Sequence, residues 1–449
     1  MADRVASSKW SAFMRDSYVK RRIPVGGTID VKKLEETARQ KLKDRQDAFL
    51  YAFGSAGTSS TCDANLVEFT KWRIIPRMLR DVTMRNLEAS TSSACLSHTL
   101  LNQDSAPQTT IFGVKYPSPL FLSPIGVQTL YHADGELASA AAAAQVGVPF
   151  IMSTASTRSI EAVAKASGSG PRWYQLYWPV SPDLTLSLIS RAKANGFSAL
   201  VITLDTMLLG WRPHDLDTAY LPFFHGVGTQ IGFTDPVFMA KHGLQPFPED
   251  DAPSFPYDPE EMERRIKAGD ETLKQRAYLG VKYMGETASG VFRSWDDLKF
   301  IRDNWDGPLI LKGILSVERL QWTMALMESS CLITASGRQV DGAVPALYAL
   351  EQIMKSPRVK EAQASGKLTI LFDSGIRTGS DVFKAIALGA QGILYARPYI
   401  YGLIVGGQAG VENVLRSVLA DTEITLGLSG YESLQQIHGK ADKVMVKLG

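Results

Sequence analysis

The sequence predicts an α/β protein built on a closed TIM (β/α)8 barrel, with an N-terminal helical extension and a long loop after the fourth strand. Three observations support this prediction. Eight short β-rich runs recur with helical segments between them, no GxGxxG turn follows the first run, and the last two runs lead directly into turns suited to an anion. In such barrels, phosphate commonly binds at the loops after the seventh and eighth strands.

The eight runs are bounded by Pro, Gly or polar turns, a pattern typical of short strands. They span residues 119–123, 149–152, 173–177, 199–204, 308–311, 331–334, 368–372 and 392–395. Intervening segments such as DGELASAAAAAQVG and SPDLTLSLISRAKANG have helical spacing and end in Gly, the usual helix stop. The missing glycine-rich turn disfavours an open dinucleotide-binding sheet.

The segment LTILFDSGIRTGSDVFKAIALGAQGILYARPYIYG, residues 368–402, is the most informative part of the chain. It contains two apolar strands joined by a helix, and each strand continues into a charged or glycine-rich turn. The turn residues suited to an anion are Ser374, Gly375 and Arg377 after the first strand, and Ala396 and Arg397 after the second. The barrel is therefore predicted to close on a phosphate site.

Polar side chains follow nearly every predicted strand. The strand ends carry 124–128 (PIGVQ), Ser153, Thr154, Gln175, Tyr177, Thr203, Asp205, Lys312, Thr334, Asp373 and Arg397. In a barrel these ends meet at one rim, where the chemistry lies. A single polar strand end is more often only a turn former. Eight that converge on one rim indicate a site for a large, polar, phosphorylated and planar cofactor.

Composition excludes several classes of protein. The 449 residues are 45% hydrophobic and 21% charged, which is ordinary for a globular protein with a large core. Lys+Arg 48 against Asp+Glu 46 gives a net charge of +2, so we expect no nucleic-acid partner and no membrane. Cys62, Cys95 and Cys331 form no CxxC pair, which indicates a reducing compartment and no metal site. Without a signal peptide, the cytoplasm is the expected location.

Two regions depart from the repeating pattern. Residues 1–118 precede the barrel and form an expected helical cap and extension, with KKLEETARQKLKDRQDAFLYAFG as its clearest helical stretch. The barrel domain is expected over 119–449. Residues 213–295 form a long insertion after the fourth strand, and loops of that length are usually functional or disordered. Its position over the rim predicts a lid.

Several motifs, in order along the chain, resemble the FMN-dependent α-hydroxy-acid oxidases and dehydrogenases. They are WRIIPRMLRDV, LSPIGVQ, TLDT, GWRPHDL, WDGPLILKGI, GRQVDGA and YARPYIYGL. The likeness extends from about residue 30 to the C-terminus and is greatest to the L-lactate 2-monooxygenase branch. It implies FMN as the cofactor, a small 2-hydroxy acid and oxygen as reactants, and a homo-oligomer that is a tetramer in relatives.

The resemblance also implies a role for each matching residue in the cofactor site. Pro124, Ile125 and Gly126 would lie against the isoalloxazine ring, and Ser153, Gln175 and Thr203 would bind its polar edge. Lys312 would stand near the N1–C2 edge, where a fixed cation stabilises the negative charge of the reduced ring. The ribityl and phosphate end would be held by Asp373, Ser374, Gly375, Ile376, Arg377, Ala396 and Arg397.

On the substrate side, the resemblance implies a carboxylate clamp made of Arg212 and Arg338, whose planar guanidinium groups suit a bidentate contact. Tyr51 and Tyr177 would donate hydrogen bonds to the carboxylate or the hydroxyl. Asp205 and Lys312 are the expected catalytic residues. For Tyr51, packing within the N-terminal cap is the competing interpretation.

One position does not match. Relatives end the sixth strand in Ser-Asn-His-Gly-x-Arg-Gln, whose histidine takes the proton from the substrate, whereas this chain reads CLITASGRQVDG, with Ala335 and Ser336 there instead. A positioned base is worth roughly 10²–10⁴ in rate. Asp205, directly or through a water, or His214 or His225 of the insertion are the alternative bases.

Two functions therefore remain open. The first is an FMN-dependent oxidoreductase that acts on a lactate-like L-2-hydroxy acid and is reoxidised by oxygen, with activity impaired by the missing histidine. The second is a catalytically silent FMN protein that still binds 2-hydroxy or 2-oxo acids. A polar insertion at 88–108 is a further departure from relatives. It and the altered sixth strand fit either a diverged protein or an error in the gene sequence.

Overall fold

The computed structural model describes residues 9–88, 111–318, 330–334 and 337–448, with the backbone alone at 330–334. All of the predicted insertion at 88–108 except Glu88, and the substituted positions Ala335 and Ser336, lie outside the described residues.

Eight parallel strands close into a barrel in sequence order, and the first and last strands pair through Leu120 and Ile393. They are β2 (Leu120–Leu122), β3 (Phe150–Met152), β4 (Arg172–Leu176), β5 (Leu200–Thr203), β6 (Leu309–Lys312), β7 (Ser330–Thr334), β8 (Leu368–Phe372) and β9 (Gly392–Tyr395). Each predicted strand end lies within one residue of the observed one. The predicted TIM barrel is therefore confirmed.

Alternation of side chains along the strands separates two cores. Inside the barrel, side chains from several strands form one apolar cluster, which Tyr116 and Ile111 close. The strand residues of this cluster are Phe121, Ile151, Trp173, Val201, Ile310, Leu371 and Leu394. Their neighbours along the strands, such as Leu120 and Leu122, belong to the larger cluster outside the barrel. The interior is therefore filled at this level, and the polar strand ends face the opening.

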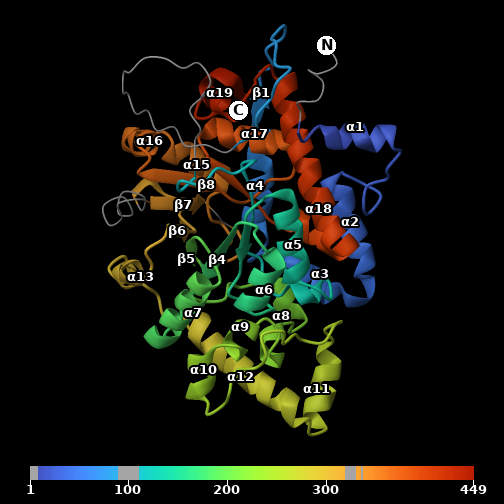
Figure 1. Cartoon of the computed structure of the whole chain (residues 1–449), viewed down its shortest axis with the longest axis vertical. Coiled ribbons are helices and arrows are strands. Elements are labelled where there is room, and N and C mark those ends of the chain that lie inside the picture. The colour runs from blue at the N-terminus through green and yellow to red at the C-terminus, as the bar shows by residue number, and fades with distance from the viewer. Residues whose placement is uncertain (1–8, 89–110, 319–329, 335–336, 449) are drawn as a thin grey trace.

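Helices surround the barrel (Figure 1). They are α5 (Glu136–Val146), α6 (Ile160–Ser167), α7 (Pro182–Ala194), α13 (Leu298–Asn304), α15 (Ala346–Ile353), α16 (Pro357–Ala364), α17 (Gly379–Leu388) and α18 (Arg397–Leu428), with the short η3 (Gln128–Leu130), α19 (Leu434–Ile437) and α20 (Ala441–Val444). Local sequence sets their ends. Helix α17 begins with a capping box of Thr378 and Asp381 and ends at Gly389, whose φ is 118°. Helix α18 bends at Gly406 and Gly407.

The N-terminal segment lies against one side of the barrel. It contains α1 (Ala12–Val19), α2 (Val31–Lys41), η2 (Lys43–Arg45), α3 (Gln46–Phe53), α4 (Ser60–Thr70) and β1 (Trp72–Ile74). Strand β1 pairs antiparallel with the C-terminal β10 (Met445–Lys447), and α2 runs beside α18 (Figure 1). Helix α3 ends at the barrel opening, which brings Tyr51 to the site.

The insertion 213–295 is a helical block whose buried side chains join the apolar cluster outside the barrel. It contains α8 (Pro213–Asp217), η4 (Pro222–His225), α9 (Gln230–Phe233), α10 (Pro236–Lys241), α11 (Pro259–Lys267) and α12 (Glu271–Thr287). These elements gather at the lower end of Figure 1. Phe233, Phe238 and Tyr283 are among the largest fully buried side chains of the described residues. The block is thus packed, although the sequence predicted only a long loop.

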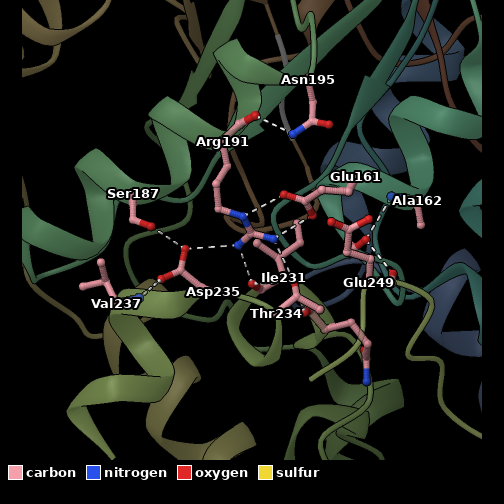
Figure 2. A network of polar contacts seen from close by, with 12 residues as sticks. Glu161, Ala162, Ser187, Arg191, Asn195, Ile231, Thr234, Asp235, Val237 and Glu249 are labelled. Atoms are coloured by element: carbon pink, nitrogen blue, oxygen red, sulfur yellow. Dashed lines mark hydrogen bonds and ion pairs between the residues drawn. The ribbon is translucent and has the colours of Figure 1, made fainter. Parts of the chain in front are cut away.

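A buried polar network fastens this block to the barrel helices (Figure 2). Arg191 of α7 contacts Glu161 of α6 at 2.8 Å and Asp235 at the start of α10 at 3.1 Å. Asp235 also accepts a hydrogen bond from Ser187 at 2.7 Å, and its side chain is fully buried. One arginine therefore ties two barrel helices to the insertion. In the part of the chain that the structure describes, no helix combines the length and apolar character needed to cross a bilayer.

Candidate cofactor and substrate site

One pocket of about 240 Å³ lies at the carboxyl-terminal ends of the strands. The structure places there all the predicted site residues except Ser153 and Gln175. Those that line it are Tyr51, Pro124, Ile125, Gly126, Tyr177, Thr203, Asp205, Arg212, Lys312, Arg338, Asp373, Ser374, Gly375, Ile376, Arg377, Ala396 and Arg397. They come from distant parts of the sequence, and the barrel brings them to one rim.

Ser153 and Gln175 lie behind the pocket wall. The Gln175 amide donates to the Thr203 hydroxyl at 3.0 Å, and its carbonyl oxygen accepts from the Ser153 hydroxyl at 3.1 Å. All three side chains are buried, and only Thr203 lines the pocket. In this structure the first two residues orient Thr203, although the sequence predicted direct contacts for all three.

Lys312 brings a positive charge to the pocket. It ends β6 beside β5, where its partner in the register is Thr203. Burial alone would lower the pKa of the Lys312 ammonium, but the Asp205 and Asp373 carboxylates outweigh burial and raise that pKa. The ammonium therefore keeps its proton at neutral pH. Burial raises the pKa of Asp373, with Lys312 acting in the opposite direction.

Two arginines meet at the predicted phosphate end. Burial lowers the pKa of Arg377, and the neighbouring Arg397 lowers it further. Among the described residues, neither guanidinium forms a salt bridge with a carboxylate. A Cβ at Gly375 would lie 2.5 Å from the Asn65 carbonyl oxygen, so only glycine fits this turn. Two adjacent cations beside a tight turn fit the dianionic phosphate of a cofactor.

The pocket wall made by Pro124, Ile125 and Gly126 also fits a planar group. A Cβ at Gly126 would lie 2.6 Å from the Ala155 carbonyl oxygen, so this turn also requires glycine. Apolar side chains of Val127, Ile125 and Leu394 line the pocket with it. An apolar wall with backbone groups at its edge suits one face of an aromatic ring system.

The two arginines predicted to clamp a carboxylate line the same pocket. Burial lowers the pKa of Arg212, and Arg338 lowers it further because the two cations repel. Arg338 donates to the carbonyl oxygens of Gly54 and Tyr51, both at 2.8 Å. Arg212 donates to the Gln339 side chain and lies 3.8 Å from the Asp215 carboxylate. The pair can hold an anion between loops from different parts of the chain.

The structure adds pocket residues that sequence reasoning missed. Cys62 accepts a hydrogen bond from Arg397 at 3.1 Å, and Phe223, Thr229 and Met284 of the insertion form part of the wall. Nothing in the pattern around these residues marked them. The motif GRQVDG did contain a usable signal, since Gln339 follows the predicted Arg338 directly.

No histidine lines the pocket among the described residues. His225 is held by the Tyr257 hydroxyl at 2.6 Å and by Glu263 at 3.3 Å, and His214 packs near Gly54. Asp205 does line the pocket, beside Lys312. Of the alternative bases considered from the sequence, Asp205 is the one that the structure places in the site.

A barrel whose rim pocket has an arginine pair at each end and an apolar wall between them fits a protein that binds a phosphorylated planar cofactor and an organic acid. A sequence model described as FMN-dependent dehydrogenase matches residues 38–443, and the chain belongs to this family. The family is FMN-dependent, so FMN is the cofactor, and its members oxidise α-hydroxy acids.

Named relatives agree with this assignment. The chain is 39% identical over 417 residues to an FMN-dependent alpha-hydroxy acid dehydrogenase of Schizosaccharomyces pombe, covering 91% of this chain and 89% of that protein. It is 32% identical to an L-lactate oxidase of Lysinibacillus sphaericus, covering 90% and 89%. A solved structure of mandelate oxidase with 3,3-difluoro-2-hydroxy-3-phenylpropionic acid superimposes with a TM-score of 0.68 at 28% identity, covering 94% and 100%.

Proposed function

We propose that this protein oxidises a small L-2-hydroxy acid such as lactate at its α-carbon, with oxygen as the final electron acceptor. The observation that carries the proposal is the meeting of Arg212, Arg338, Lys312 and Asp205 in one pocket. The first two suit the carboxylate of the substrate, and the other two lie where its carbinol carbon would face the cofactor.

Within the proposal, FMN would be held along the rim. Arg377, Arg397 and Gly375 would hold the phosphate, Asp373 the ribityl chain, and 124–126 one face of the ring. Bound FMN supplies the acceptor for two electrons from the α-carbon. The fixed Lys312 ammonium would favour the reduced cofactor, because it needs no reorganisation when negative charge accumulates on the ring.

The chain's own residues would orient the acid and move one proton. Arg212 and Arg338 would grip the carboxylate, while the hydroxyls of Tyr51 and Tyr177 would hydrogen-bond it. Burial raises the pKa of both tyrosines, which keeps them protonated donors. A carboxylate oxygen of Asp205 would receive the substrate proton in place of the absent imidazole. Since Asp205 is not the family's base, turnover would be roughly 10²–10⁴-fold below that of a histidine-containing relative.

The second candidate is a silent FMN protein that binds 2-hydroxy or 2-oxo acids without oxidising them. The sequence favours it at one point, where Ala335 and Ser336 occupy the place of the family histidine. The carboxylate clamp and the phosphate arginines are the same in both candidates. The candidates therefore differ only in whether a proton acceptor exists in the loaded site.

Flavin absorbance during anaerobic addition of L-lactate distinguishes the two candidates. We expect bleaching over seconds to minutes, and Asp205→Asn should abolish it while leaving oxalate binding intact. Flavin that stays oxidised in protein that still binds oxalate would establish the silent candidate. Colourless protein that takes up no added FMN would refute both.

The product distinguishes the outcome with oxygen. An oxidase converts lactate and oxygen to pyruvate and hydrogen peroxide, whereas a monooxygenase of the expected branch forms acetate, carbon dioxide and water. The insertion supports the second outcome, because its side chains line the pocket and can retain the product. A homo-oligomer, by family resemblance, and a cytoplasmic location, as the default expectation from the sequence, complete the proposal.

A further inference from the structure

A fully buried carboxylate, Glu136, lies behind the pocket wall, and nothing in the proposed chemistry uses it. It is the first residue of α5 and follows Gly135, whose φ is 51°. Its exposure is 0%. A negative charge at this end of a helix is favoured by the helix dipole. No Lys or Arg among the described residues forms a salt bridge with it, so hydrogen bonds must satisfy its oxygens.

Three donors point at Glu136. The backbone amides of Gln128 and Thr157 donate to Oε1, both at 3.0 Å. The Thr157 hydroxyl donates to Oε2, while its own oxygen accepts from the Thr129 amide at 3.3 Å. Both oxygens of Glu136 are therefore acceptors, which is the role of an ionised carboxylate.

Gln128 connects Glu136 to the pocket wall through hydrogen bonds. The side-chain NH2 group of Gln128 donates to the Ile125 carbonyl oxygen at 2.9 Å. The side-chain carbonyl oxygen of Gln128 accepts from the Ser139 hydroxyl at 2.6 Å. The Tyr399 hydroxyl, 3.3 Å from the same amide, donates to the Ser123 carbonyl oxygen at 3.0 Å. The carbonyl groups of Ser123 and Ile125, before and within the 124–126 turn, are thus held by buried side chains.

The turn needs such support because Val127 is strained. Its φ of 59° and ψ of 41° lie in the left-handed region. A β-branched residue is an outlier there, and such strain persists only where surrounding contacts enforce it. The Gln128 amide, which directly follows Val127, is one of the three donors to Glu136. The carboxylate thus holds the strained residue at the end where the chain leaves the pocket wall.

We propose that Glu136 is a positioning residue of the cofactor site, which acts through Gln128 to hold Val127 left-handed and so aligns the 124–126 turn against the isoalloxazine ring. The inference rests on the proposed placement of the cofactor. A positioning role for Glu136 differs from a merely structural one in its effect on ligand binding. Loss of the carboxylate should affect binding of the ring more than binding of the phosphate.

The experiment compares wild type with Glu136→Gln, which puts an amide among the three donors. Glu423→Gln is the matched control, because Glu423 is 1% exposed, accepts from the Ser11 amide at 2.6 Å and does not line the pocket. For each protein we would measure the Kd for FMN, the Kd for inorganic phosphate, the visible absorption bands of bound FMN, and the Tm.

We expect Glu136→Gln to raise the Kd for FMN about tenfold to a hundredfold, because a hydrogen bond to a charged group is lost. The absorption bands of bound FMN should shift, and the Kd for phosphate should stay within about twofold. Adding Val127→Gly should restore much of the FMN affinity, because glycine adopts the left-handed conformation without strain. If Glu136→Gln does not fold, Thr157→Val replaces it, because that variant removes only the hydroxyl donor. It should raise the Kd for FMN by a smaller factor and leave the Kd for phosphate unchanged.

Equal FMN affinity and spectra in Glu136→Gln and wild type would overturn the inference alone. So would parallel losses of FMN and phosphate affinity that track a fall in Tm, as in the control. Wild type that binds no FMN would overturn the proposed function and this inference together.

Discussion

Asp341 accepts hydrogen bonds from both the backbone amide and the hydroxyl of Thr58, each at 2.8 Å. Its other oxygen accepts from the Ser60 hydroxyl at 2.6 Å, at the start of α4. Arg338, three residues before Asp341, donates to the Gly54 and Tyr51 carbonyl oxygens. The loop that carries Arg338 is thus joined to the segment that follows α3, the helix that carries Tyr51.

This clasp predicts the effect of Asp341→Asn. The variant should raise KM for the acid about threefold to tenfold with a smaller change in kcat, because it misplaces Arg338 and Tyr51 without removing either. The FMN affinity should not change. A variant with unaltered KM and unaltered affinity for oxalate would show that the loops hold their positions without Asp341.

The same carboxylate predicts a pH dependence. Hydrogen bonds from Ser60 and Thr58 hold the pKa of Asp341 well below its usual value of 3.8. A lowered folded-state pKa stabilises the protein above the unfolded value, and this contribution is lost as the pH falls from there through the folded-state pKa. Below pH 4 the wild type should therefore lose stability more steeply than Asp341→Asn in urea titrations. Parallel curves would contradict the prediction.

Arg338→Ala should weaken carboxylate binding directly. We expect the Kd for oxalate to rise about tenfold to a hundredfold, since a hydrogen-bonded charge is removed from a buried clamp. Arg264→Ala is the control, because its salt bridge with Glu261 is on the exposed α11. An unchanged Kd for oxalate in Arg338→Ala would refute the role of the residue.

Lys312→Met should lower the reduction potential of bound FMN and slow flavin reduction by about a hundredfold or more, because the fixed cation at the ring edge is lost. The folded-state pKa of Lys312 is raised, so its charge stabilises the protein at neutral pH and is lost only as the pH rises through that pKa. Deprotonation of Lys312 should thus contribute no change in the wild-type potential between pH 6 and 9. A wild-type potential in the variant would argue against the placement of Lys312.

Cys62 should react with iodoacetamide in the apoprotein and be protected by FMN. Burial opposes ionisation of the thiol, but Arg397 and the Ser55 hydrogen bond hold the pKa of Cys62 below its ordinary value of 9.0. The rate of alkylation should therefore reach its plateau at a lower pH than for a free thiol. The measurement uses a variant in which Cys95 and Cys331 are serine. Equal rates with and without FMN would place Cys62 outside the phosphate end.

Arg191→Met should destabilise the junction between barrel and insertion. It leaves the buried Asp235 and the partly buried Glu161 without their cation, a loss of about 3–5 kcal/mol for a buried pair broken on one side. Urea denaturation measures this loss of unfolding free energy, and Arg265→Ala, which removes a half-exposed arginine paired with Asp270, serves as the control. Equal unfolding midpoints for the two variants would show that the network in Figure 2 does not stabilise the contact between the insertion and the barrel helices.

The strands and the rim could be predicted because their signals are local. Each strand is a short apolar run with a turn behind it, and parallel strands in a barrel deliver their ends to one face. Asp205, Lys312 and Arg397 could thus be assigned to one site before their geometry was known. The fold of the insertion could not be predicted in this way, because Phe233, Phe238 and Tyr283 find partners only when separate short helices pack together.

The barrel, the likeness to an FMN-dependent family and the replacement of a histidine by Ala335 and Ser336 can be read from the linear sequence, which also predicts a clamp of two arginines. Each of these features depends on residue types at fixed spacing, and the amino-acid sequence contains both. The folded chain alone shows that Gln175 lies behind Thr203, that Cys62 contacts Arg397, and that Glu136 accepts from the amide that follows the strained Val127. These contacts join residues that are 8, 28 and 335 positions apart, so their chemistry exists only once the packed fold has excluded water between them.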